Sequence, residues 1–332
     1  MDSRLTEELA ERVLKGDEMS AARLISLVEA GNQAAYRELT KLLPHTGHAH
    51  VIGVTGPAGS GKSTIIGKVA LRMCEEGKGL GIIAIDPTSM RSRGALLGDR
   101  VRMKEAESTG QVFIRSMADR DHPGGVCRAS MGAVYVMEGL GKECIIIESV
   151  GAGQSDKALF QICDTVVTVF TPEFGDEIQL LKAGLLEIGD IVVINKGDKG
   201  GTEDVRCAIS AHVEKGAEGD WSIPILITEA HLGKGVDELM NAIKSRWDFL
   251  REGGREKAAR KEKVTSFMLA LLKEEIWRRF IDTCSGETAF EQITEGVRSG
   301  AIDPYSAVEI IAERIEARIR ENVHSFVRND GK

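Results

Sequence analysis

One glycine-rich stretch, GPAGSGKST at residues 56–64, contains the residue types best suited to chemistry. It satisfies the pattern G-x-x-x-x-G-K-[ST] and lies between an apolar run and a helical run, the context that a phosphate-binding loop requires. Its glycines let several backbone N–H groups point at one phosphate, and the following helix N-terminus adds a positive dipole. Lys62 would reach the β- and γ-phosphates, and the Ser63 hydroxyl would bind Mg²⁺. We expect the phosphates at Gly59, Ser60, Gly61, Lys62, Ser63 and Thr64.

A second polar motif, Asn195-Lys196-Gly197-Asp198, directly follows the apolar run 191–194 and indicates which base is bound. The Asp198 carboxylate can accept hydrogen bonds from N1–H and the exocyclic amine of guanine. Adenine offers no such donor pair and would leave a buried acceptor unpaired. Asn195 would lie near the acceptor edge of the base, and the stem of Lys196 over its ring. N-K-x-D alone is a weak pattern, but after a late strand of a phosphate-loop domain it favours guanine.

Three acidic residues follow the pattern of a magnesium-dependent nucleotide site. Glu148 ends an apolar run and begins the stretch Glu148-Ser149-Val150-Gly151, in which the Gly151 N–H would meet the γ-phosphate and the acid would act through Mg²⁺. Asp86 ends another apolar run, where its carboxylate can join or orient the metal's ligands. Asp99 lies in a glycine- and arginine-rich stretch that fits a mobile switch as well as it fits a surface ion pair.

Two further polar groups have weaker functional signals. The histidines at 45, 48 and 50 resemble a metal-binding tract, but no cysteine or acid accompanies them, so the sequence does not favour a metal site there. Four polar residues follow Gly175 in a helical run, and a solvated helix face explains them as well as a functional role does. They are Asp176, Glu177, Gln179 and Lys182.

The elements that must position these residues are short apolar runs, each followed by a helical stretch. Their continuous apolarity predicts strands covered on both faces, and therefore a mostly parallel, doubly wound α/β sheet. The predicted strands are 51–55, 81–85, 112–114, 144–147, 165–170, 191–194 and 225–227. Before them, amphipathic helices are expected, one capped by Ser20 and one over 33–43. After them, residues 251–263 form a charged linker or exposed helix start, and Asp303-Pro304 begins a last helix.

These patterns predict three parts: an N-terminal helical extension at 1–50, a phosphate-loop domain at 51–250 and a C-terminal helical arm at 251–332. The stripe Met268, Leu272, Ile276 and Phe280 in the arm needs a partner surface. Either the arm folds onto the sheet domain or it pairs with a second subunit.

Composition excludes several classes of protein. The 332 residues contain 43 Lys and Arg against 51 Asp and Glu, and this net charge of −8 argues against nucleic-acid binding. No apolar run approaches the roughly 18 residues that a bilayer span needs, and the N-terminus lacks the pattern of a signal or transit peptide. We therefore expect a cytoplasmic protein. The six cysteines are scattered, which indicates reduced thiols.

Taken together, the chain resembles the MeaB/ArgK-type GTPases, also called methylmalonyl-CoA mutase-associated GTPases, within the SIMIBI class. The resemblance covers nearly the whole chain and is carried by five stretches. These are GPAGSGKST (56–64), AIDPTSMRSRGALLGDRVRM (84–103), IESVGAGQSD (147–156), GDEIQLLKAG (175–184) and NKGD (195–198).

The resemblance implies a homodimeric, Mg²⁺-dependent chaperone that binds GTP and GDP and serves an adenosylcobalamin-dependent acyl-CoA mutase, gating its cofactor loading and protecting or repairing it. It places Asp86, Asp99 and Glu148 in the Mg²⁺ and switch machinery. The stretch 176–187 would match the family's extra switch, which couples nucleotide state to the mutase.

The chain departs from the family pattern in two places. The S-A or S-G expected after the last strand reads Thr228-Glu229-Ala230. The Ala230 N–H can still donate to the base oxygen, but Glu229 replaces a small hydroxyl residue. Gln154 is a candidate, without further support, for positioning the attacking water. The competing hypotheses are a nickel-delivering GTPase, a phosphate-loop kinase, and a nucleotide-gated scaffold whose hydrolysis is incidental.

Overall fold

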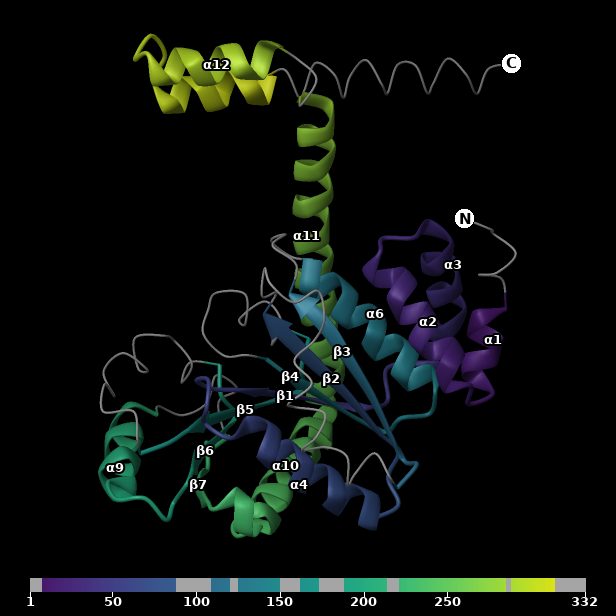
Figure 1. The fold of residues 1–332 in the computed structure, drawn as a ribbon, viewed down its shortest axis with the longest axis vertical. Coiled ribbons are helices and arrows are strands. Elements are labelled where there is room, and N and C mark those ends of the chain that lie inside the picture. Colours follow the sequence, from purple (N-terminus) through teal and green to yellow (C-terminus); the bar gives the residue numbers. More distant parts are fainter. Residues whose placement is uncertain are drawn as a thin grey trace. The chain divides into compact units, whose positions relative to one another are not determined.

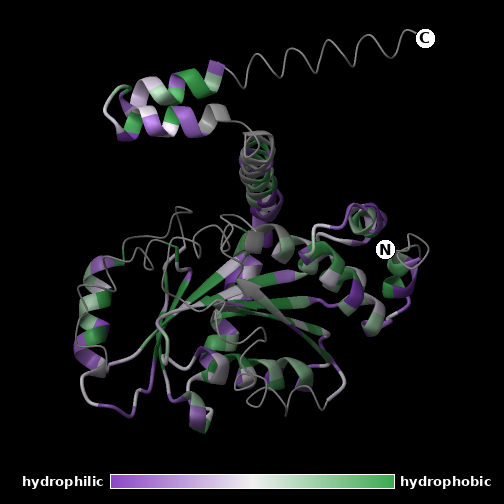
Figure 2. Ribbon diagram, turned by 45° about the horizontal axis from the view of Figure 1, so that its top comes forward, coloured by the Kyte–Doolittle hydropathy of each residue, from purple (hydrophilic) through white to green (hydrophobic). Residues whose placement is uncertain are grey.

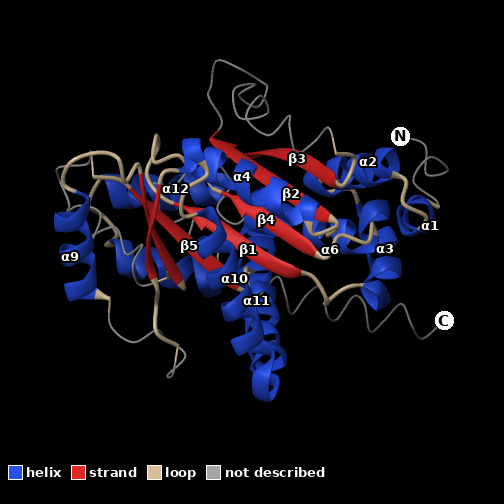
Figure 3. Cartoon of the chain, turned by 90° about the horizontal axis from the view of Figure 1, so that it is seen from below, coloured by secondary structure: helices blue, strands red, loops and turns tan. Residues whose placement is uncertain are grey.

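A computed structural model of the chain describes residues 8–87, 109–119, 125–149, 162–172, 188–213, 221–284 and 288–313. Seven strands form one sheet in the order β3-β2-β4-β1-β5-β6-β7, with every neighbouring pair parallel (Figure 3). The strands are β1 (His50–Thr55), β2 (Leu80–Pro87), β3 (Val112–Asp119), β4 (Cys144–Glu148), β5 (Thr165–Phe170), β6 (Ile191–Asn195) and β7 (Ile225–Thr228). Each predicted apolar run lies in one of them, so the expected doubly wound parallel fold is confirmed.

Helices cover both faces of this sheet (Figure 1). The helices α4 (Lys62–Glu75) and α10 (Val236–Arg251) pack on one face, where they share a core with β1, β5 and β6. The helix α6 (Gly125–Gly139) packs on the other face against β2 and β3. The helix α9 (Thr202–His212) packs over β5 and β6, where it covers Phe170, Val192 and Ile194. The strands between the helices are mainly hydrophobic in Figure 2, as burial on two sides requires.

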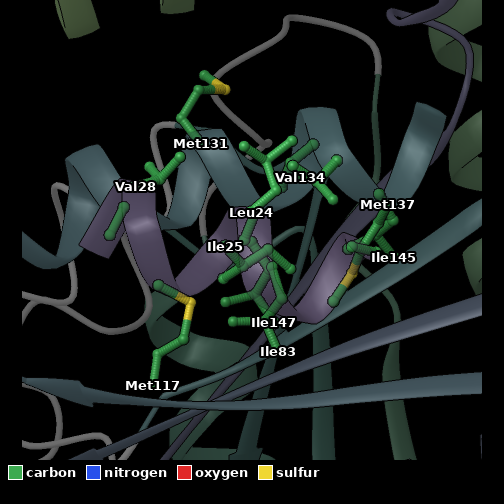
Figure 4. Packing of buried hydrophobic residues seen from close by; sticks show 14 of the residues in the cluster. Leu24, Ile25, Val28, Ile83, Met117, Met131, Val134, Met137, Ile145 and Ile147 are labelled. Atoms are coloured by element: carbon green, nitrogen blue, oxygen red, sulfur yellow. The ribbon is translucent and has the colours of Figure 1, made fainter. Parts of the chain in front are cut away.

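The N-terminal helices extend the core beyond α6. They are α1 (Leu9–Leu14), α2 (Glu18–Glu29) and α3 (Gln33–Leu42). Side chains of α2, α6 and strands β2 and β4 meet in one apolar cluster, in which Leu24, Ile25 and Ile147 are buried (Figure 4). The prediction that Ser20 caps α2 is wrong: Asp17 is the N-cap and accepts from the amides of Met19 and Ser20. The helix therefore begins at Glu18, about one turn before the start that a Ser20 cap would give.

The C-terminal part of the chain is helical. After α10, a short 3₁₀ turn with Gly253 at φ 70° leads into α11 (Arg255–Cys284), so residues 255–263 begin a helix and are not a linker. It is followed by α12 (Thr288–Arg298) and by a helical segment at 304–313, which Asp303 caps as predicted. The chain divides into the compact units Met1–Met268 and Leu269–Lys332. Within the described ranges, no helix has both the length and the apolar character that crossing a bilayer requires.

The first turns of α11 are fixed to the segment that enters β1. Arg260 donates from Nη1 to the Gly47 carbonyl, and from Nη2 to the Ala49 carbonyl at 2.7 Å and to Asp164 Oδ2 at 3.1 Å. On the other side of this segment, the Glu138 carboxylate accepts from the amides of residues 47–49. In the segment 47–49, backbone N–H groups therefore donate to Glu138 and carbonyl groups accept from Arg260. These contacts anchor the beginning of α11.

Candidate nucleotide-binding site

The phosphate-loop motif forms the turn between β1 and α4, at the carboxyl edge of the sheet, and its glycines are required by sterics. Gly56 has φ 146°, and a Cβ atom there would lie 2.1 Å from the Val169 carbonyl oxygen. Gly61 has φ 91° and is the N-cap of α4, and a Cβ atom there would lie 2.2 Å from Asn195 Nδ2. Any side chain at these positions would displace the loop from its neighbours. The loop therefore leaves the α4 N-terminus available to an anion.

Lys62, the first residue of α4, folds back over the loop. Its Nζ donates to the carbonyl oxygens of Gly56 at 2.8 Å and Pro57 at 3.0 Å, and the residue is buried. These contacts hold the ammonium group at the loop, and a bound phosphate would offer it a stronger, charge-assisted partner.

Ser63 and Glu148 come from separate elements and meet beside the loop. The Ser63 hydroxyl donates to Glu148 Oε1 at 2.7 Å, and both residues are buried. Glu148 is brought there by the parallel register of β4, in which it pairs with Val54 of β1 and Ala84 of β2. A hydroxyl and a carboxylate oxygen are the ligands that Mg²⁺ prefers, so this donor set fits the ion.

Asn195, the last residue of β6, connects the phosphate loop to the loop after β7. Its Nδ2 donates to the Ser60 carbonyl at 2.9 Å. Its Oδ1 accepts from the Thr228 hydroxyl at 3.0 Å and from the Ala230 amide at 3.1 Å. The side chain is buried, and Asn195 pairs in register with Thr228. One amide therefore holds three segments together at the carboxyl edge of the sheet.

The rest of the N-K-x-D motif leaves the strand in a tight turn. Lys196 has φ 60°, in the left-handed region, and its carbonyl accepts from the Lys199 amide at 2.9 Å. The Gly197 amide donates to the Thr228 carbonyl at 3.0 Å, so the turn stays joined to β7. Asp198 is exposed at the tip of this turn. A carboxylate presented in this way is open to an incoming base.

The loop after β7 accommodates the unexpected Glu229 without distortion at Ala230. The Ala230 amide is directed at Asn195 Oδ1, while the Glu229 carboxylate pairs with Lys234 at 3.1 Å. The acid that replaces the expected small hydroxyl residue is therefore paired with a neighbouring cation.

Of the remaining predicted residues, the structure describes some and not others. Thr64 lies in the first turn of α4. Asp86 lies near the carboxyl end of β2, two residues beyond the register partner of Glu148, and thus at the same edge of the sheet. Other candidates lie outside the described residues, namely Asp99, Gly151, Gln154, Asp176, Glu177, Gln179 and Lys182.

The three predicted histidines do not gather into a site. The His50 and Trp247 rings are stacked with their centroids 4.4 Å apart, and His50 Nε2 lies 2.7 Å from the Thr165 hydroxyl oxygen. The backbone N–H of His48 donates to the Glu138 carboxylate. No group of three His, Cys, Asp or Glu side chains suited to a metal occurs in the part of the chain that the structure describes.

Sequence reasoning did not assign roles to two residues beside this site. Thr228 binds Asn195 through its hydroxyl, and Lys234 binds Glu229. For Thr228, the signal was a hydroxyl residue at the end of a strand that neighbours the N-K-x-D strand. For Lys234, it was a lysine flanked by two glycines, which both adopt positive φ in the structure.

Comparisons with known proteins agree with this geometry. The model of a family described as methylmalonyl-CoA mutase-associated GTPase MeaB matches residues 21–285. A Pyrococcus abyssi protein named as a GTPase is 40% identical over 315 residues, which cover 94% of this chain and 97% of that protein. The mouse protein named methylmalonic aciduria type A homolog, mitochondrial, is 29% identical over 344 residues, covering 96% and 81% respectively.

A solved structure shares the fold. The crystal structure titled LAO/AO transport system kinase superposes with a TM-score of 0.71, and the match covers 95% of this chain and 99% of that one. Its sequence is 22% identical to this one, so the likeness is one of architecture.

Proposed function

Because the chain belongs to the MeaB family of methylmalonyl-CoA mutase-associated GTPases, we propose that it is a Mg²⁺-dependent GTP-driven chaperone for an adenosylcobalamin-dependent acyl-CoA mutase. The homologues establish GTP hydrolysis as the activity of the family. The proposal adds which residues perform that hydrolysis and which kind of protein receives the signal.

The phosphates lie against the backbone amides of the Gly56–Gly61 turn, with Lys62 at the β- and γ-phosphates. Lys62 leaves the carbonyls of Gly56 and Pro57 for this purpose. Ser63 and Glu148 would hold Mg²⁺, directly or through its water shell, and Asp86 lies at the same edge. When bound, the ion would neutralise charge on the β- and γ-phosphates. The protein then contributes positioning and charge, which is what phosphoryl transfer to water requires.

The guanine base lies against the Asn195–Asp198 turn. Asp198 accepts from the base's N1–H and exocyclic amine, and the Lys196 stem covers the ring. On binding, the Ala230 amide would turn from Asn195 Oδ1 to the base oxygen. The observation that carries this assignment is the hydrogen-bonding of Asn195, which connects the phosphate-loop carbonyl of Ser60 to the Ala230 amide. A single nucleotide would thus contact both ends of a preformed network.

A mutase partner is supported by the family's description, which names methylmalonyl-CoA mutase. In this proposal, loss of the γ-phosphate changes the partner interface through the predicted switch residues Asp99, Gly151 and 176–187, which lie outside the described residues. The segment 176–187 contains the partner-coupling candidates Asp176, Glu177, Gln179 and Lys182.

A homodimer is supported by an apolar stripe on α11. Five large apolar side chains of this helix are each more than 40% exposed: Val264, Met268, Leu269, Leu272 and Ile276. A patch of this kind on a charged helix marks a protein interface, and we assign a second copy of the chain to it. Sedimentation of the full chain and of Leu272→Glu tests this. Wild type should run as a dimer and the variant as a monomer, and a wild-type monomer would overturn the assignment.

The nucleotide assignment is tested with Lys62→Ala and Asp198→Asn. Lys62→Ala should abolish GTP hydrolysis in the purified chain, because Lys62 is the one cationic residue in the sequence of the loop, 56–64. Asp198→Asn should shift preference from GTP toward xanthosine triphosphate, because the amide pairs with the xanthine edge. Near-normal turnover by the first variant, or an unchanged base preference in the second, contradicts the assignment.

The chaperone role is tested by reconstitution. The chain, bound to GDP or to a non-hydrolysable GTP analogue, is mixed with adenosylcobalamin-dependent acyl-CoA mutases of the same organism. We expect a complex whose affinity depends on the nucleotide, faster GTP hydrolysis, and gated transfer of the cofactor. A variant that binds GTP without hydrolysing it separates this role from a nucleotide-gated scaffold. Absence of any complex in both nucleotide states contradicts the proposal.

A further inference from the structure

The loop that follows β7 closes on itself between residues 229 and 234. The Glu229 amide donates to the Lys234 carbonyl at 3.1 Å, and the two residues form an isolated antiparallel bridge. Between them, Ala230–Leu232 makes a 3₁₀ turn, and Gly233 at φ 76° reverses the chain. Residues 229 and 234 are therefore neighbours through the backbone before any side-chain contact is considered.

The same loop carries the amide that is assigned to the base oxygen. Ala230 is buried, and its amide is directed at Asn195 Oδ1, 3.1 Å away. On its far side the loop packs closely on β7, because a Cβ atom on Gly235 would lie 2.3 Å from the Ile227 carbonyl oxygen. The direction of the Ala230 amide thus depends on how the Glu229 end of the loop is held.

The Glu229 side chain begins close to the base-binding turn. A Cβ atom placed on Gly197 would lie 3.9 Å from Cγ of Glu229, so the stem of the acid lies near the N-K-x-D motif. Both of its carboxylate oxygens lie 3.1 Å from Lys234 Nζ. The Glu229 side chain is 21% exposed and that of Lys234 is 65% exposed. An uncompensated carboxylate on this loop would repel an anionic nucleotide, and Lys234 neutralises it.

From these contacts, we propose that Glu229 and Lys234 form a positioning pair that sets the affinity of the site for guanine nucleotides. This inference rests on the proposed assignment of Asn195, Asp198 and Ala230 to the base. Where the family pattern has a small hydroxyl residue, this chain uses an ion pair: Glu229 lies near the base-binding turn, and Lys234 fixes its direction and cancels its charge. Neither residue is assigned a contact with the nucleotide's reacting atoms.

The expected effect is modest, because the pair is partly exposed. Removing the cation with Lys234→Met leaves the acid uncompensated, and the dissociation constant for GDP should rise about two- to fivefold. Lys234→Glu should raise it about tenfold, since it adds a second repulsive charge. Lys234→Arg keeps both the charge and the hydrogen bonds, and should bind GDP as the wild type does.

The test is a double-mutant cycle on the full chain, with GDP titrated by fluorescence at low and high salt. Glu229→Gln in the Lys234→Met background should restore most of the lost affinity, because the unpaired acid is gone. The effect of Lys234→Met should shrink in 0.5 M salt, which screens an electrostatic role but not a purely structural one. The matched control is Arg206→Met, which breaks the exposed Glu203–Arg206 pair on α9 and should leave GDP binding unchanged.

Two results would overturn the inference: unchanged GDP affinity in Lys234→Met and Lys234→Glu, or a double variant whose loss equals the product of the single losses. The Asp198→Asn variant separates this outcome from failure of the proposed function. If Asp198→Asn changes base preference while the Lys234 variants bind normally, only the pair is refuted. If Asp198→Asn binds GTP as before, the base assignment itself is wrong.

Discussion

Asn195→Ala tests the central hydrogen-bond network more severely than any other single change. The substitution removes three buried side-chain hydrogen bonds, to the Ser60 carbonyl, the Thr228 hydroxyl and the Ala230 amide. Each is an ordinary neutral hydrogen bond with a distance between 2.9 and 3.1 Å. The three partners remain in a site from which water is largely excluded, since Asn195 is only 4% exposed.

The magnitude follows from counting these bonds. A typical intramolecular hydrogen bond contributes about 1 kcal/mol net, so the loss of three should lower the free energy of unfolding by about 3 kcal/mol. Thr228→Val is the matched control, because it removes one of the three bonds, and its expected cost is about 1 kcal/mol. Asn195→Asp keeps the acceptor but sets an oxygen against the Ser60 carbonyl, so it should destabilise the protein more than Thr228→Val does.

The assay is urea unfolding of the nucleotide-free chain, followed by circular dichroism, with GDP titration of the same samples. The midpoint should fall in the order wild type, Thr228→Val, Asn195→Ala, at an unchanged m-value. GDP affinity should fall in parallel, because both loops lose their common tether. If Asn195→Ala costs no more stability than Thr228→Val, the contacts with Ser60 and Ala230 contribute nothing and the reasoning is refuted.

Three other outcomes are expected. Gly56→Ala should weaken GDP binding at least about tenfold by titration calorimetry, because its Cβ atom would meet the Val169 carbonyl oxygen at 2.1 Å and strain of this kind costs about 1–3 kcal/mol; unchanged affinity would count against the loop geometry. Arg260→Met should lower the free energy of unfolding by about 2 kcal/mol in urea, since it removes a cation that pairs with the nearly buried Asp164 carboxylate; a neutral result would mean that the anchor of α11 is dispensable. Burial raises the pKa of Cys144 from 9.0 to about 12, so the folded state holds its proton more tightly, and the stability this contributes is complete below pH 9 and is lost as the pH rises toward 12. Alkylation at pH 8 followed by mass spectrometry should accordingly modify the exposed Cys207 and spare Cys144, and equal labelling would contradict this burial.

The fold was largely predictable because its signals are local. Seven continuous apolar runs indicated strands buried on both faces, and each became a parallel strand. The helix beginnings were less certain: Asp17 and Ser20 are both good N-caps, and the choice depends on where α1 ends. The anchoring of α11 was not predictable, because Arg260 meets residues more than ninety positions away, and no short pattern encodes that contact.

The sequence by itself determined which residue types the candidate site contains, because the phosphate loop and the N-K-x-D turn are runs of adjacent residues. Tertiary structure decided which groups meet. Parallel register brings Glu148 to Ser63, and the order of the strands brings Asn195 to Ser60 and Ala230. The Glu229–Lys234 pair depends on a chain reversal that two glycines permit but do not specify. Hydrogen bonds between distant segments arise only when packing has set the geometry, so they are properties of the folded chain.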